Sequence, residues 1–127
     1  MIRPSRFAVK KRPDFRALGR LEPGRRNKTE AAFERFLEGE RQVGNVLWYA
    51  FEAVKLRLAD DCFLTLDFMV LRADSLVELV DVKGSRGMFQ DDARVKIKVA
   101  AALYPFRFVA AYPRPKKDGG GWEIEEF

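Results

Sequence analysis

Three consecutive segments rich in Leu, β-branched and aromatic residues occupy the middle of this chain, and they limit the folds open to it. They read NVLWYAFEAVKLRLAD (45–60), CFLTLDFMVLR (62–72) and SLVELVDVKG (75–84). Turn signals at 60–61 and 73–75 separate them. Short apolar runs between turn signals are typical of β-strands. The pattern therefore predicts a meander of three strands.

A helix is predicted before these strands, beginning at NKTEAAFERFLEGE (27–40). Asn27 is a favourable N-cap residue, and Glu30 stands three positions later, where a capping-box glutamate is found. Gly39 and Gly44 are expected to end the helix. Its predicted buried stripe consists of three large apolar side chains: Phe33, Phe36 and Leu37.

The remaining chain predicts a second helix, a fourth strand and a final hairpin. The helix covers DDARVKIKVAAALYP, with Asp91 or Asp92 as its cap and Pro105 just past its end. Its predicted core stripe is Val95, Val99, Ala102 and Leu103. FRFVAAY is the fourth strand, PRPKKDGGG a basic turn and WEIEEF the last strand. The expected fold is α/β, a mixed sheet flanked by helices, in the order α-β-β-β-α-β plus a final hairpin.

Composition excludes several kinds of chemistry. The 127 residues fit one domain, contain no histidine and have one cysteine, Cys62. No Ser-His or Cys-His nucleophile, histidine-dependent nuclease centre or multi-cysteine zinc site can form. Catalysis would have to use carboxylates, lysines and a hard metal ion with oxygen ligands.

The positive charge is concentrated in the first 26 residues. This segment holds nine Lys/Arg against Asp14 and Glu22, a net of +7, so residues 27–127 carry −2 of the total +5. Proline and glycine interrupt any helical or strand period, which predicts a flexible basic arm (1–26) before the folded domain (27–127). The arm suits binding to a phosphate backbone, or it is a solvated tail. With no long apolar run or secretory segment, a cytoplasmic protein that does not enter a membrane is expected.

Charged residues inside apolar strands indicate a candidate site. Asp67 interrupts a run that is apolar on both faces, and Asp81 and Lys83 end the next strand. Residues two apart in a strand share a face, so Asp81 and Lys83 should point the same way. A hairpin across 73–75 would set Asp67 opposite Asp81, within one residue of register. Alternatively, Asp81 and Lys83 form a surface pair, and backbone donors cap Asp67.

Two neighbouring carboxylates favour a shared hard cation, and Mg²⁺ is typically held by one or two carboxylates together with a phosphate. A metal-activated water could hydrolyse a phosphodiester, while Lys83 orients or deprotonates that water. Helical geometry leaves Glu30 at the rim of the buried stripe, from which it can reach the site. Glu30 is equally explained as a capping-box residue.

The spacing of Glu30, Leu66-Asp67-Phe68 and Asp81-Val82-Lys83-Gly84 resembles the PD-(D/E)xK nuclease superfamily, closest to a small phage-associated family akin to Holliday-junction resolvases and phage endonuclease I. Leu66 stands where a proline is usual, and Asp81 where glutamate is commoner. The resemblance implies a restriction-endonuclease-like core over residues 27–127. It implies Asp67, Asp81 and the Val82 carbonyl as ligands of Mg²⁺, or of Mn²⁺ as a substitute. It makes Lys83 the catalytic lysine and Glu30 the helix-borne acid.

By the same resemblance, the function is metal-dependent endonucleolytic cleavage of DNA, on branched or structured substrates in phage DNA metabolism, in the host bacterial cell. The alternatives are a non-catalytic nucleic-acid-binding protein with the same fold and an RNA-directed nuclease. A homodimer would supply the two cuts that a junction needs, and no organic cofactor is expected. The expected nucleic-acid contacts are Lys96, Lys98, Lys116, Lys117, Arg25 and Arg26. For Lys96 and Lys98 a solvated helix face, and for Lys116 and Lys117 a soluble turn, are the alternatives.

Overall fold

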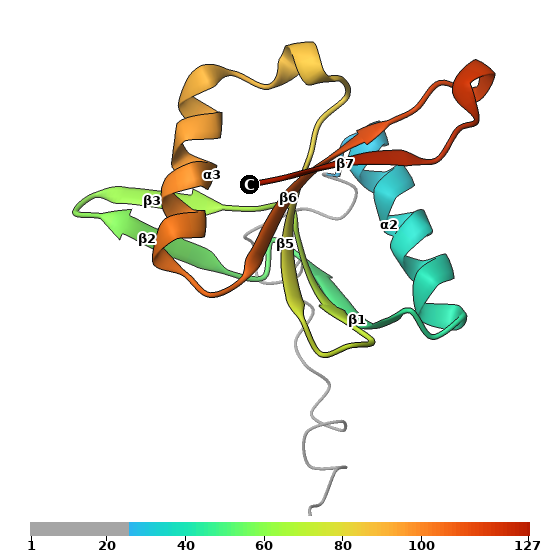
Figure 1. The fold of residues 1–127 in the computed structure, drawn as a ribbon, viewed down its shortest axis with the longest axis horizontal. Helices are drawn as coiled ribbons and strands as arrows, with labels where there is room; N and C mark the ends of the chain where they lie inside the picture. The colour runs from blue at the N-terminus through green and yellow to red at the C-terminus, as the bar shows by residue number, and fades with distance from the viewer. Residues whose placement is uncertain (1–25) are drawn as a thin grey trace, which may run out of the picture.

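A five-stranded mixed β-sheet with strand order β1-β4-β5-β6-β7 is the centre of the part that the computed structural model describes, residues 26–127 (Figure 1). A separate two-stranded sheet, β2-β3, lies beside helix α3. The elements in chain order are α2 (Lys28–Gln42), β1 (Val46–Phe51), β2 (Lys55–Ala59), β3 (Cys62–Thr65), β4 (Phe68–Arg72), β5 (Val77–Val82), the 3-10 helix η2 (Arg86–Met88), α3 (Asp91–Leu103), β6 (Arg107–Pro113), the 3-10 helix η3 (Lys116–Asp118) and β7 (Trp122–Glu126).

The broad class, an α/β domain with a mixed sheet and two helices, is confirmed, but the strand count between the helices is wrong. Each of the first two predicted strands is two strands. The chain leaves β1 at Glu52, whose φ of 48° is left-handed, and it breaks again before Asp67. The segment between these breaks folds into the β2–β3 hairpin. A continuous apolar run does not reveal such a break, because a left-handed glutamate has no sequence signal.

The hairpin predicted across residues 73–75 is present, and it connects β4 to β5 in antiparallel register. Ser75 takes a φ of 73° in the turn, and Asp74 Oδ1 accepts a hydrogen bond from the Leu76 amide at 3.0 Å. β5 then pairs in parallel with β6, with α3 in the crossover connection. β6 and β7 form the predicted final hairpin.

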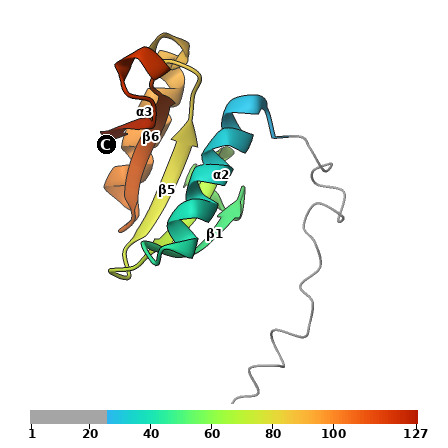
Figure 2. The ribbon, with the colours of Figure 1, turned by 90° about the vertical axis from the view of Figure 1, so that its right-hand side faces the viewer.

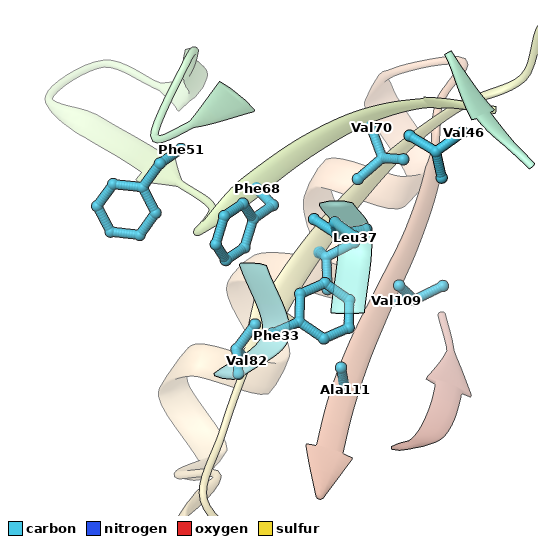
Figure 3. Packing of buried hydrophobic residues seen from close by; sticks show 10 residues of the cluster. Phe33, Leu37, Val46, Phe51, Phe68, Val70, Val82, Val109 and Ala111 are labelled. Atoms are coloured by element: carbon cyan, nitrogen blue, oxygen red, sulfur yellow. The ribbon is translucent and has the colours of Figure 1, made fainter. Parts of the chain in front are cut away.

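Helices α2 and α3 cover opposite faces of the sheet, as Figure 2 shows on either side of β5. Phe33 and Leu37 of α2 pack on Phe68, Val80 and other apolar residues of the sheet (Figure 3). On the other face, a second cluster contains Ile97 and Ala100 of α3. The two clusters together form the two halves of a three-layer α/β/α core.

The predictions for α2 are confirmed for its start and for Gly44, which follows the C-cap residue Val43 with a φ of 91°, and they are wrong for Gly39 and Phe36. Asn27 and Glu30 form the capping box, with Glu30 N–H donating to Asn27 Oδ1 at 2.7 Å and Asn27 N–H to Glu30 Oε1 at 3.0 Å. The helix continues through Gly39 to Gln42. Phe36 is 40% exposed rather than buried. A glycine inside a packed helix costs only about 1 kcal/mol, which tertiary packing can offset.

The core stripe predicted for α3 is wrong. Val95, Val99 and Leu103 are exposed, and the helix buries Ile97 and Ala100 instead. The N-cap is Gln90, one residue before the two aspartates. Two apolar stripes run along this helix at helical spacing, and periodicity alone cannot decide which one faces the sheet. None of the helices in the described part is long and apolar enough to span a membrane.

Candidate active site

Two acidic residues meet where β4 begins and β5 ends. Phe68 of β4 pairs with Val80 of β5. Continuing this antiparallel register by one residue sets Asp67 directly opposite Asp81, as the sequence predicted. Glu52 N–H donates to the Asp67 carbonyl at 2.7 Å, so the left-handed turn after β1 fixes the backbone of Asp67.

Asp67 is a partly buried carboxylate that accepts a hydrogen bond from one backbone amide. Its Oδ2 accepts a hydrogen bond from the Val82 amide at 2.7 Å, so the capping alternative is part of the arrangement. Burial and, next, the charge of the nearby Asp81 raise the pKa of Asp67 to about 8, although the hydrogen bond from the Val82 amide opposes the increase. Glu30 also raises this pKa, through its charge and through a side-chain hydrogen bond. In the absence of a cation, Asp67 therefore retains a proton at neutral pH.

Asp81 and Lys83 form an ion pair on the same face of the sheet. Lys83 Nζ lies 3.2 Å from Asp81 Oδ2. This oxygen is buried, and no donor in the described residues reaches it with hydrogen-bond geometry. Burial raises the pKa of Asp81, Lys83 lowers it, and Glu30 raises it again. The pair is more buried than an ordinary surface ion pair, because the carboxylate side chain is only 13% exposed.

Glu30 forms the predicted capping box and also lies close to the acidic pair. It completes the capping box at the start of α2, and its charge acts on both Asp67 and Asp81. The start of α2 is held close to the segment after Lys83, since a Cβ built on Gly84 would lie 4.0 Å from Thr29 Oγ1. Helix capping and proximity to the acidic pair are thus compatible.

The acidic pair has the properties expected of a cation site. Within residues 26–127, no three acidic or cysteine side chains converge into a ready-made metal-binding group. Mg²⁺ typically uses only one or two carboxylates and completes its coordination with water and phosphate. Asp67 and Asp81 are partly buried, and their charges repel each other. A divalent cation would relieve both costs, so these residues fit the metal that the sequence predicted.

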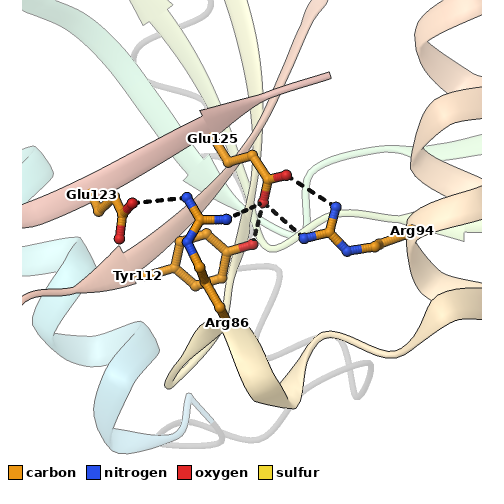
Figure 4. A network of polar contacts seen from close by, with 5 residues as sticks. All are labelled: Arg86, Arg94, Tyr112, Glu123 and Glu125. Atoms are coloured by element: carbon orange, nitrogen blue, oxygen red, sulfur yellow. Dashed lines mark hydrogen bonds and ion pairs between the residues drawn. The ribbon is translucent and has the colours of Figure 1, made fainter.

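Basic and aromatic residues on or next to η2, α3 and β6 border this site and were not among the predicted site residues. Arg94 and Arg86 both bind the carboxylate of Glu125, which also accepts a hydrogen bond from Tyr112 Oη at 2.6 Å (Figure 4). The Phe89 ring lies 5.5 Å from Lys83 Nζ and 4.7 Å from the Arg94 guanidinium. Two features of the sequence pointed toward them. Glutamates alternate with Ile124 in β7, and Arg94 lies on the same side of α3 as Lys98.

The predicted nucleic-acid contacts are dispersed over the surface. Lys96 is exposed, and its Nζ lies 3.5 Å from the Phe63 carbonyl. Lys98, Lys116 and Lys117 are also exposed. Arg26 packs its guanidinium 4.3 Å from the Phe51 ring centroid and pairs with Glu34 at 2.6 Å. Arg25 and the rest of the arm, residues 1–25, lie outside the described residues.

A cavity of about 300 Å³ lies on the opposite face of the sheet, beneath α2. Phe36, Trp122 and Arg72 contribute to its lining. Glu78 is 8% exposed at this cavity and is held between Arg107 at 3.2 Å and Arg72 at 3.6 Å. Glu78 is at the start of β5, whereas Asp81 is near its end, so the two acidic sites are separate.

Comparisons with known proteins provide no family or function for this chain. Searches against protein-family models, curated proteins and solved structures found no match to this chain. The features that bear on function are therefore the partly buried, facing carboxylates of Asp67 and Asp81 and the lysine beside them.

Proposed function

We propose that this chain is a metal-dependent endonuclease of the PD-(D/E)xK type, which hydrolyses phosphodiester bonds in DNA. The observation that carries the proposal is the partly buried, facing pair of Asp67 and Asp81 beside Lys83, in which burial and the charge of Asp81 raise the pKa of Asp67. Buried acids with raised pKa values beside a lysine are typical of functional sites, because they cost stability when no ligand is present.

The residues that would hold the divalent cation are Asp67, Asp81 and the Val82 carbonyl. The bound ion supplies Lewis acidity, which neutralises phosphoryl charge and makes a water molecule more acidic. Asp67 would hold the ion as a carboxylate, with its Oδ2 oriented by the hydrogen bond from the Val82 amide. Lys83 is within 3.2 Å of Asp81 and can contact either the attacking water or the phosphate charge.

The finer fold assignment, a restriction-endonuclease-like core, belongs to the same proposal. Three features support it. Helix α2, which carries Glu30, precedes the sheet; the antiparallel β4–β5 hairpin brings the two aspartates together; and α3 connects β5 to the parallel strand β6. Branched or structured DNA as the preferred substrate, and phage DNA metabolism as the setting, rest on the sequence resemblance. The search for a preferred substrate should therefore include several nucleic-acid shapes.

The test is cleavage of a labelled panel: four-way junction, flap, linear duplex, single strand and RNA, each with Mg²⁺, Mn²⁺ or EDTA. Asp81→Asn and Lys83→Met are the active-site variants. Asp118→Asn and Lys55→Met are matched controls, because they make the same substitutions at exposed positions that belong to neither β4 nor β5. Nucleic-acid binding of every variant is measured in EDTA.

The proposal expects metal-dependent cleavage that falls at least about 100-fold in both active-site variants and stays near wild type in both controls. Cleavage of RNA alone would identify an RNA-directed nuclease. Binding without any metal-dependent cleavage by the wild type would refute the catalytic proposal and favour a nucleic-acid-binding protein.

A further inference from the structure

The carboxylate of Glu125 occupies an anion-binding site made of two arginines and a tyrosine (Figure 4). Arg94 donates from Nη1 to Oε2 and from Nη2 to Oε1, both at 3.0 Å. Oε1 also accepts from Tyr112 Oη at 2.6 Å and from Arg86 Nη1 at 3.2 Å. Glu125 is held as an anion, since the hydrogen bond from Arg94 is the main cause of its lowered pKa.

This donor set fits a phosphate group as well as it fits a carboxylate. The planar fork of an arginine binds two oxygens of either anion, and a second guanidinium with a hydroxyl can contact the remaining phosphate oxygens. Arg86 has the additional partner Glu123, at 2.8 Å. The glutamates thus supply the negative charge that a phosphate would otherwise bring to these two arginines.

The anion-binding site lies beside the candidate active site. Glu125 of β7 pairs with Ala110 of β6, which pairs with Asp81 of β5. Two strand spacings correspond to about 10 Å, or roughly three nucleotide steps along one DNA strand. The Phe89 ring lies next to both Lys83 and Arg94, so the proposed catalytic lysine and this arginine pack against the same aromatic side chain.

The site is accessible from solvent. The Arg86 side chain is half exposed, and the side chains of Arg94 and Glu125 are partly exposed. The bidentate pair with Arg94 and the shared donors make Glu125 a stronger competitor than a lone surface carboxylate, so an incoming anion displaces it only if it brings further contacts. A polyanion that releases counterions can therefore compete with Glu125 for the two arginines.

We propose that Arg86 and Arg94 form a binding site for a backbone phosphate of the nucleic-acid substrate, and that Glu125 occupies this site until the substrate displaces it. The inference rests on the proposed function, which it deepens by assigning the phosphate contact that aligns the strand with Asp81 and Lys83. Because every nucleic acid must displace Glu125 to bind, the net affinity is lowered for all of them. Substrates that make further contacts are therefore favoured.

The experiment compares Glu125→Gln with Glu126→Gln in the full-length chain. Both variants remove one negative charge from β7, but Glu126 is exposed and pairs with Arg107 instead. Arg94→Gln is compared in the same way with Arg41→Gln, an exposed arginine that pairs with Glu38 on α2. Fluorescence anisotropy measures binding of labelled single-stranded DNA, duplex DNA and RNA in EDTA over a series of salt concentrations.

The expected result is that Glu125→Gln binds nucleic acid about three- to five-fold more tightly than Glu126→Gln, as loss of a competing ion pair implies. Arg94→Gln should bind more weakly than Arg41→Gln, with a salt-dependence slope smaller by about one. Equal affinities within each pair would overturn the inference. If Glu125→Gln does not fold, the Arg94 comparison decides, because Glu125 there keeps Arg86 and Tyr112 as partners.

The inference and the proposed function fail in different ways. Cleavage that requires Asp81 and Lys83, together with equal affinities of Glu125→Gln and Glu126→Gln, would refute only the phosphate site. The expected differences in affinity without any metal-dependent cleavage would refute only the nuclease. A wild-type chain that binds none of the three nucleic acids would refute both.

Discussion

Asp67→Asn should stabilise the metal-free protein, and increasingly so as the pH rises. In the unfolded chain this carboxyl has an ordinary pKa of 3.8, whereas the folded chain holds it at about 8. Below pH 3.8 both states are protonated, and the free energy of unfolding keeps the full contribution of this group. Between these two pKa values the unfolded state releases a proton that the folded state retains, so wild-type stability falls as the pH rises.

The size of the effect follows from the same two values. Each pH unit in this interval corresponds to about 1.4 kcal/mol, which gives an upper limit of about 6 kcal/mol above pH 8. Part of the cost is shared with Asp81, so a gain of about 2 kcal/mol at pH 8 is a realistic expectation for the variant. The side-chain oxygen of the asparagine can still accept a hydrogen bond from the Val82 backbone N–H, and its side-chain NH₂ group can donate a hydrogen bond to Glu30.

The assay is urea-induced unfolding in EDTA at several values between pH 5 and pH 9, with the exposed Asp118→Asn as control. The difference in free energy of unfolding between Asp67→Asn and wild type should grow with pH, while the control stays parallel to wild type. Added Mg²⁺ should stabilise wild type more at pH 8 than at pH 5. Parallel curves for Asp67→Asn and wild type would show that Asp67 is not held protonated, and the argument from its burial would fail.

Three other substitutions have defined expectations. Lys83→Met removes the cation that lowers the pKa of Asp81, so in EDTA the melting temperature of the variant should fall further below that of wild type as the pH rises from 5 to 8. A difference in melting temperature that does not change with pH would argue against this pairing. Glu78→Ala leaves two arginines without their buried partner and should cost about 3 kcal/mol in urea unfolding, whereas a loss below about 1 kcal/mol would contradict that role. Ile97→Ala should cost about 2–4 kcal/mol and Val99→Ala less than about 1, and the reverse order would contradict the observed orientation of α3.

Local signals were sufficient for the parts of the fold that depend on near neighbours. The capping box of Asn27 and Glu30, the turn at residues 73–75 and the final hairpin were predicted because each is a short-range arrangement. The facing aspartates followed from the same hairpin, since strand alternation and a short turn together determine the register. The carboxylate pair and Lys83 were accordingly identified before any tertiary contact was known.

Long-range packing decided what the local patterns left open. The stripe of α3 that faces the sheet is Ile97 and Ala100 rather than Val95 and Val99, because the choice between two apolar stripes depends on what the helix packs against. The division of the central apolar runs into β1 to β4 likewise required the left-handed Glu52.

The sequence by itself determined the chemistry available to this protein: carboxylates and a lysine without histidine, carried by a hairpin and by the start of a helix. The tertiary structure alone decided their environment, because the burial of Asp67 and Asp81 and the repulsion between them arise only when distant segments pack together. It also brought Arg86, Arg94 and Glu125 to one point beside Lys83. These residues are separated by up to 39 positions along the chain, and no local pattern could relate them.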